Sequence, residues 1–326
     1  MEIKKINSSN IDSFSFKLYS ADLIIEQTDF KNIEIESDAI LDQDYEIIEK
    51  ANSIEVIEKR RSFLNFSFFN NEKTFNIKIP ESISLFISIA SGDLKILNKI
   101  SNEAEKKYFK TKTMDIKLTS GDFSAENLST AIFIFSATSS DLSIEKSILG
   151  KTKIKGISSD LYFNNCMVDE LEAKTISGDL SLKLLSFNKI EADLKSGDIS
   201  IICPKTKING QFETLSGDVD IDGIEIDKNI SSPFLLLKTL SGDIYVNGKY
   251  EDLKRPVFTE ISEPIKSAFE ESSKKDEREK FIQLLCDEKI SEKEAAELLK
   301  GFGFSEDEID SIFEEYLFRK INKGQK

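Results

Sequence analysis

The sequence predicts a mainly β chain, a parallel β-solenoid of about 19-residue coils followed by a small C-terminal α-helical module. Two observations predict the solenoid. The tripeptide Ser-Gly-Asp recurs at a nearly constant interval, and an alternation of apolar and polar residues follows each copy. A fixed period in this range indicates one supersecondary unit stacked on copies of itself. Beyond residue 276, apolar residues at helical spacing predict the helical module.

The repeat runs along the middle of the chain as six copies of Ser-Gly-Asp and two of a Ser-Ser-Asp variant. Its aspartates are Asp93, Asp122, Asp141, Asp160, Asp179, Asp198, Asp218 and Asp243, in steps of 29, 19, 19, 19, 19, 20 and 25 residues. The first and third residues after each aspartate are apolar, as in a strand with one buried face. Nineteen residues are too few for a βαβ crossover, so we expect equivalent strands of successive coils to pair in parallel.

The Ser-Gly-Asp step is expected to form a corner of each coil, because Gly permits a positive φ and Ser and Asp side chains bond neighbouring amides. Ser140 and Ser159 stand at the Gly position in two coils, which indicates that a positive φ is not required there. Stacking would bring the aspartates into a column of like charges about 4.8 Å apart. We expect their carboxylates to bond turn amides, and a ladder of shared cations is the alternative.

These patterns divide the chain into four sections. Residues 1–90 are expected to form an irregular β cap with the first coils, in which Ser20-Ala21-Asp22 is a degenerate copy of the repeat. Residues 91–255 carry the regular coils, residues 256–275 form a linker, and residues 276–326 form three short helices.

Helices as short as those predicted for residues 276–326 bury little surface on their own. We therefore expect the helical tail to bind a protein partner or to self-associate. Ile312, Phe313 and Tyr316 lie on one helical stripe and are the expected contact residues.

Composition argues against several classes of protein. A net charge of −15 disfavours nucleic acid as a partner, and the lack of His removes His-based triads and His metal sites. Three cysteines far apart in the sequence fit a reducing compartment better than a disulfide framework. The chain shows no signal peptide and no run of 18 apolar residues, so we expect a cytoplasmic protein without a transmembrane segment.

Asp218, Asp220 and Asp222 mimic the start of an EF-hand calcium loop, but the twelfth position is Asn229 and no helices flank the segment. We therefore expect no metal site and no cofactor, with the three aspartates on the outward face of a strand. Cys166 and Cys203 have no adjacent group to lower the thiol pKa, so core packing is expected for both.

A second candidate is the basic and aromatic segment that contains Lys59, Arg60, Arg61, Phe66 and Phe68. A basic cluster beside exposed aromatics is typical of a surface that contacts a membrane or a protein groove. The same residues also fit a hairpin strand with its Phe side chains packed on the end of the solenoid, and we prefer the hairpin.

Two stretches resemble known bacterial families. The stretch Phe75-Asn76-Ile77-Lys78-Ile79-Pro80 and the Ser-Gly-Asp ladder after it resemble the β-solenoid family named "putative adhesin", over most of residues 10–250. Residues 276–299 look like the short helical module of the LiaX and YvlB group of envelope-stress proteins, although that group commonly has the module at its N-terminus. The resemblance supplies no catalytic residues.

From these observations we expect a non-enzymatic, adhesin-like scaffold or binding protein in the bacterial envelope-stress response. The solenoid flank would provide recognition, and the helical tail would bind a protein partner or an envelope component. One alternative is a polysaccharide-active enzyme on a β-helix, with Asp218, Asp220, Asp222 and Glu225 on one flank. Another is a peripheral membrane protein that uses residues 59–69.

Overall fold

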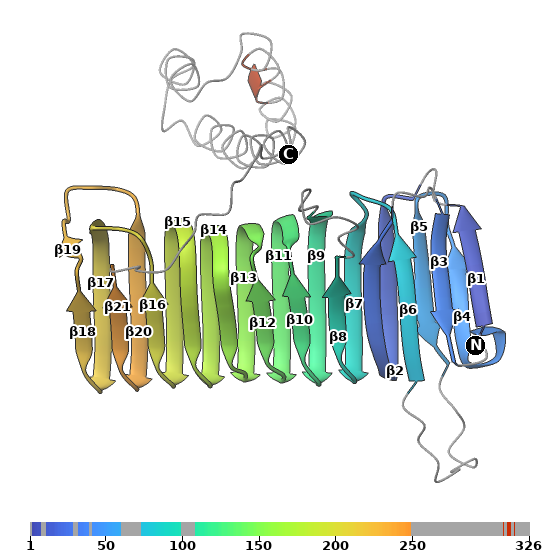
Figure 1. Cartoon of the computed structure of the whole chain (residues 1–326), viewed down its shortest axis with the longest axis horizontal. Coiled ribbons are helices and arrows are strands. Elements are labelled where there is room, and N and C mark those ends of the chain that lie inside the picture. Colours follow the sequence, from blue (N-terminus) through green and yellow to red (C-terminus); the bar gives the residue numbers. More distant parts are fainter. Residues whose placement is uncertain are drawn as a thin grey trace, which may run out of the picture. The chain divides into compact units, whose positions relative to one another are not determined.

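The structure is a computed structural model, and it describes residues 2–7, 11–28, 32–38, 41–59, 73–98 and 108–248 together with Ile309, Ile312, Phe313 and Tyr316. The chain divides into two compact units, Met1–Val257 and Phe258–Lys326. Almost all described residues belong to the first unit, and most of these lie in strands (Figure 1). The prediction of a mainly β chain is therefore confirmed.

The described elements of the first unit are strands apart from one short helix. In chain order they are β1 (Glu2–Asn7), β2 (Ser13–Gln27), β3 (Asn32–Ser37), α1 (Leu41–Asp44), β4 (Tyr45–Glu49), β5 (Ser53–Glu58), β6 (Lys73–Ile79), β7 (Ser84–Ser91), β8 (Leu94–Leu97), β9 (Phe109–Ser120), β10 (Phe123–Glu126), β11 (Leu128–Ser139), β12 (Leu142–Glu145), β13 (Ile148–Ser158), β14 (Leu161–Ser177), β15 (Leu180–Ser196), β16 (Ile199–Ile202), β17 (Lys207–Ser216), β18 (Val219–Asp222), β19 (Glu225–Ile226), β20 (Phe234–Ser241) and β21 (Ile244–Asn247).

Strands one repeat apart pair in parallel, as the period predicts. β14 and β15 show the register at full length, with Leu161 opposite Leu180 and Ala173 opposite Ala192, 19 residues on in each case. The same offset joins β11 to β13 and β10 to β12. Figure 1 shows the strands side by side along the unit. Because one register is repeated along the chain, residues at the same position of successive repeats lie in a row that runs from coil to coil.

Apolar rows on the inner face form the core. The row that follows the aspartates is at most 1% exposed from Leu94 through Phe123, Leu142, Leu161, Leu180 and Ile199 to Ile244. Full burial of each such side chain stabilises the fold by roughly 1.5–3 kcal/mol. The alternation seen in the sequence arises because successive strand residues point to opposite faces, and only one face lies inside the coil.

The coils near the C-terminal end of the stack are not in chain order. β20 pairs with β15 on one side and with β17 on the other, and β21 likewise lies between β16 and β18. The last coil in sequence is thus inserted between the two coils that precede it, and β17 and β18 stand at the end of the stack (Figure 1). Sequence order predicts that β17 and β18 lie between β15 and β16 on one side and β20 and β21 on the other. The structure corrects that expectation.

The N-terminal end shows a similar insertion and also carries a cover. β2 lies between β5 and β6 on one side and β7 and β8 on the other, so the first long strand is the second layer of the stack. Ser20 pairs with Ser91, which confirms that Ser20-Ala21-Asp22 is a copy of the repeat. Beyond this layer β3 pairs antiparallel with β6, β1 with β3, and β4 with β5.

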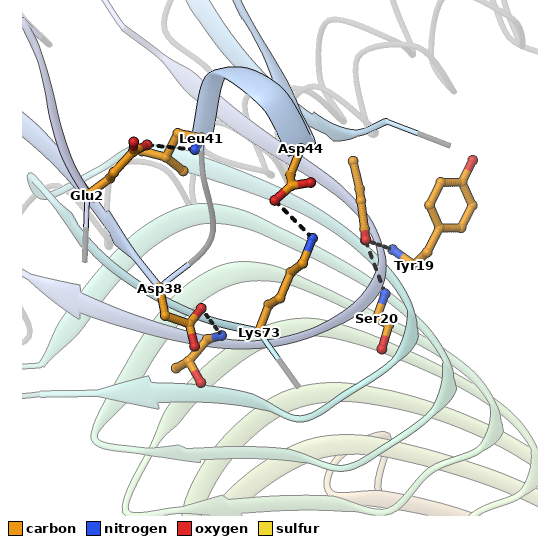
Figure 2. Close-up of polar contacts among 9 residues, drawn as sticks. Glu2, Tyr19, Ser20, Asp38, Leu41, Asp44 and Lys73 are labelled. Carbon is orange, nitrogen blue, oxygen red and sulfur yellow. Dashed lines mark hydrogen bonds and ion pairs between the residues drawn. The ribbon is translucent and has the colours of Figure 1, made fainter. Parts of the chain in front are cut away.

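Polar contacts hold this N-terminal cover in place (Figure 2). The Glu2 carboxylate accepts the Leu41 amide at 2.7 Å, and Lys73 forms an ion pair with Asp44 at 3.5 Å. The Glu58 carboxylate accepts the amides of both Tyr19 and Ser20, so it joins β5 to the corner of β2. The cover is therefore attached to the coils by side chains as well as by strand pairing.

In the second unit, Ile309, Ile312, Phe313 and Tyr316 are helical. The rest of the predicted three-helix module, and the predicted linker at residues 256–275, lie outside the described residues. None of the helices that the structure describes is long and apolar enough to cross a membrane.

Candidate functional site

The aspartates of the repeat form a continuous ladder along one corner of the solenoid. At each step the backbone amide of one aspartate donates a hydrogen bond to Oδ1 of the aspartate in the adjoining coil, at 2.8–3.0 Å. In spatial order the Asp ladder is Asp22, Asp93, Asp122, Asp141, Asp160, Asp179, Asp198, Asp243 and Asp218. The expected bond to a turn amide is present, but the amide belongs to the next coil and not to the residue's own turn. Each such bond stabilises the stack and offsets part of the repulsion between like charges.

Close stacking explains the Gly of the corner. Gly197 has a φ of +136°, and a Cβ at this position would lie 2.1 Å from the Gly178 carbonyl oxygen of the adjoining coil. Gly242 has the same geometry against the Gly197 carbonyl, which is 2.1 Å from its notional Cβ. Only a residue without a side chain fits, because both the backbone conformation and the neighbouring coil exclude a Cβ.

Ser140 and Ser159 replace Gly without adopting a positive φ, as the sequence indicates. Both side chains are buried, and their hydroxyl oxygens have no hydrogen-bond partner among the described residues. Room for them comes from small residues three positions earlier, Ala137 and Gly156. A Cβ on Gly156 would lie 3.0 Å from the Ser159 Cβ. In coils with Gly at the corner, the residue three positions before that Gly is larger, such as Leu194 before Gly197. The pairing of a corner Ser with a small residue is therefore visible in the sequence.

The two Ser-Ser-Asp coils create a polar cavity of about 280 Å³ at the corner. Its lining includes the carboxylates of Asp122, Asp141 and Asp160 and the exposed Ser139 and Ser158. The three carboxylates are spaced one coil apart and do not converge on one point. Within the described residues, no group of three or more Asp, Glu or Cys side chains has the geometry of a metal site. The cavity thus presents hydrogen-bond acceptors and hydroxyls to solvent.

A row of exposed side chains runs beside the Asp ladder. It consists of the residue just before the first Ser of each copy, and the pairing register places Ile157, Ile176, Lys195, Leu240 and Leu215 one after another. The four apolar members are 50%, 56%, 49% and 84% exposed, in that order. We call this row and the Asp ladder the corner surface. Reasoning from the sequence missed the row, although a large apolar residue at this position in four of the eight copies is the signal for it.

Asp218, Asp220 and Asp222 lie on the last coil of the stack. Asp218 is the final member of the Asp ladder, and Asp218 and Asp220 are exposed. Val219 and Ile221 alternate with them on the opposite face of β18, as the strand interpretation predicts. These aspartates also do not belong to a metal-binding group of described residues.

The other predicted contact residues are only partly described. Lys59 is exposed at the end of β5, where its amide donates to the Asp44 carbonyl. Arg60, Arg61, Phe66 and Phe68 lie outside the described residues. In the second unit Ile312 and Tyr316 are buried and Phe313 is half-buried. Their proposed contact with a partner stays a prediction.

Cys166 and Cys203 are buried in the core, which confirms the expected packing role. Burial raises the pKa of the Cys166 thiol to about 12 and that of Cys203 to about 11. A protonated, enclosed thiol is a poor nucleophile, so neither side chain is suited to covalent catalysis. Cys286 lies outside the described residues.

Solved structures of low sequence identity resemble the chain. One is described as a putative adhesin from Bacteroides fragilis, with 13% identity, a TM-score of 0.48, and coverage of 76% of this chain and 96% of that one. Another is described as a putative adhesin from Parabacteroides merdae, with 12% identity, a TM-score of 0.47, and coverage of 74% and 95%. No curated protein matches the chain significantly.

A family model gives a match over most of the chain. It covers residues 11–247, from the start of β2 to the last residue of β21, and so includes every coil described above. The chain therefore belongs to the Toastrack DUF4097 family.

Proposed function

We propose that the chain is a non-enzymatic binding protein that recognises a protein partner through the corner surface. The observation that carries this proposal is the row of Ile157, Ile176, Leu240 and Leu215, each about half exposed or more. Single exposed apolar residues are ordinary on protein surfaces. In this row Lys195 separates the pair Ile157 and Ile176 from the pair Leu240 and Leu215. Neighbouring exposed apolar residues rimmed by polar ones are typical of an interaction site.

The Asp ladder gives this surface two properties that suit recognition. Its hydrogen bonds join every coil to the next, so the exposed row is held on a rigid support with little conformational entropy to lose on binding. Its carboxylates favour partners that carry positive charge near an apolar strip, and the net charge of −15 favours the same partners at long range.

Binding accounts for these residues better than hydrolysis of a polysaccharide. A glycosidase needs two carboxylates about 5–10 Å apart across the bond that is cleaved. In the Asp ladder one oxygen of each carboxylate, Asp218 excepted, is engaged by the next coil's amide as a structural acceptor. The ladder lines one corner, so it offers no second carboxylate on an opposite wall.

The cellular role is part of the same proposal. The likeness of residues 276–299 to the LiaX and YvlB module supports a role in the bacterial envelope-stress response, in the cytoplasm and peripheral to the envelope. In this role the solenoid recognises its partner, and the helical tail recruits a further protein or another copy of the chain. A chain that ends at Glu263 tests these separate roles of the solenoid and the tail, because it retains every described coil and lacks the tail.

The test of the corner surface is affinity capture from the native cell with matched variants. Ile157→Lys combined with Ile176→Lys places two charges in the row. Tyr162→Lys is the control, since Tyr162 is 42% exposed on another part of the coil surface. We expect a partner captured by the wild type to be lost with the double variant and kept with the control. Thermal unfolding of all three proteins checks that the fold is intact.

Two results would overturn the proposal. Capture of the same partners by the double variant would remove the corner surface from recognition. Release of sugar from bacterial glycans by the wild type, abolished in an Asp141→Asn variant, would favour the enzyme instead.

A further inference from the structure

Among the described residues, nothing covers the apolar core of the solenoid at the C-terminal end of the stack. Val219 continues the row of Ile199 and Ile244, each 0% exposed, yet Val219 is 43% exposed. Ile221 and Phe212 are half-buried, while the residues beside them in the adjoining coil, Val246 and Leu237, are fully buried. The last coil thus presents inward-facing apolar side chains that further burial would stabilise.

In the part of the chain that the structure describes, the backbone at this end pairs mainly on one side. Among the described residues, β18 pairs only with β21, and β17 pairs with β20 along its length and with β19 only at Lys207 and Ile208. At the opposite end β3, β1 and β4 cover the outermost coil. Within the described chain, 209–216 and 219–221 therefore form an open edge, which is a template for an added strand.

The charge of the open edge selects the kind of strand that can pair with it. Asp218 and Asp220 are exposed along β18, whereas the positions level with Asp220 in the adjoining coils are the neutral Tyr245 and Ser200. Two copies meeting at this end would bring the aspartates against each other, and like charges across a strand pair are destabilising. A strand with Lys or Arg at alternate positions would instead place its cations beside them.

We propose that the open edge binds one extended segment of a partner protein, with apolar and basic side chains in alternation. The segment adds a strand to β18. Its apolar side chains cover Val219 and Ile221, and its basic side chains face Asp218 and Asp220. This site lies at the end of the stack, where it shares Asp218 with the corner surface, and it does not depend on what binds to the row of Ile157 and Ile176.

The test uses the full chain and a labelled octapeptide, Lys-Val-Lys-Ile-Lys-Val-Lys-Ile. We expect binding by fluorescence polarisation that weakens as salt rises, because the ion pairs are at the surface. Asp218→Asn combined with Asp220→Asn should weaken binding about three- to tenfold. Glu170→Gln removes one charge from an exposed residue in the middle of the stack and should change the affinity less than about twofold. Hydrogen exchange should show that the peptide protects those amides within 218–221 that β21 does not bond.

The competing occupants give different results, and each would overturn the proposal. Equal binding of a peptide of the same composition with its lysines in one block would show attraction by charge alone. Protection in the free full-length monomer of those amides within 218–221 that β21 does not bond would show that the chain covers its own edge. A dimer that dissociates when Val219→Lys is introduced would identify a second copy as the occupant. Calcium binding that is lost in the double Asn variant and that excludes the peptide would assign the aspartates to a metal.

Discussion

The backbone amide of Asp243 donates a hydrogen bond at 2.8 Å to the carboxylate of Asp198, a residue 45 positions earlier in the chain. The Asp218 amide donates in turn to Asp243, also at 2.8 Å. The aspartate of the last coil therefore stands between those of the two coils before it. The coil that contains β17 can complete its pairing only after β20 and β21 have entered the stack. Long-range pairing of this kind makes the C-terminal end dependent on the last strands.

Substitution of Leu237 is expected to reveal the dependence of β17 and β18 on β20. It is fully buried in β20 between Ala192 and Phe212, so Leu237→Ala should destabilise the fold by about 2–5 kcal/mol. Amides of β17 and β18 should lose hydrogen-exchange protection with those of β20. Leu236→Ala is the control, since Leu236 is only half-buried and should cost no more than about 1 kcal/mol. Unchanged protection of β17 in the Leu237 variant would contradict the inserted order.

The corner glycines and serines should respond oppositely to alanine. Gly197→Ala combines a strained φ with a Cβ 2.1 Å from a carbonyl oxygen, so we expect a loss of more than about 3 kcal/mol. Ser159→Ala removes a buried hydroxyl that has no partner among the described residues. Its effect should lie between neutral and about 1 kcal/mol of stabilisation. Chemical denaturation of both variants measures the difference, and similar losses would refute this account of the corner.

Asp160 separates the two roles of a ladder carboxylate, hydrogen-bond acceptor and negative charge. Oδ1 of Asp160 accepts the Asp179 amide at 2.8 Å. Asp160→Ala deletes the acceptor and should cost about 1 kcal/mol. Asp160→Asn keeps a carbonyl oxygen for the amide and removes one charge from the column, so we expect a change within about 0.5 kcal/mol. If both variants were equally destabilised, the charge would be the important property, as it would be in a cation ladder. Denaturation with and without added calcium distinguishes the two cases.

Glu172 is expected to make stability depend on pH. Lys174 and Lys153 lie 2.8 and 2.9 Å from its carboxylate and lower its pKa from 4.5 to about 2. Because the folded pKa is below the unfolded one, the stabilisation is present above about pH 4.5 and is lost as the pH falls towards 2. Glu172→Gln should therefore cost up to about 1 kcal/mol at pH 7 and less at pH 3. Glu170→Gln, on the same strand, is the control. A Glu172 penalty that does not shrink in acid would exclude the ion pairs as its source.

Some features could be predicted from the sequence because they depend on the repeat alone. The alternation after each aspartate defines which face is buried, so the rows through Leu161 and Leu180 follow from it. The pairing of Asp carboxylates with corner amides follows from the residue types in the turn. The exposed row that contains Ile157 could also have been found, because its position before the Ser is constant. It was missed because an apolar residue in a strand is usually assigned to the core.

The sequence by itself determined the parallel coils, their spacing, their buried rows and the Asp corner, since each rests on a local pattern that every copy repeats. Only the tertiary structure decided the order of the coils and the condition of the two ends. Copies of one repeat are interchangeable as partners, so the coil of Asp243 pairs as well with Asp198 as the coil of Asp218 could. That choice depends on the connecting segments and on packing over the whole stack. The antiparallel cover of β3 and β1 at one end, and the open edge at Val219 at the other, follow from that choice and are not encoded in any single repeat.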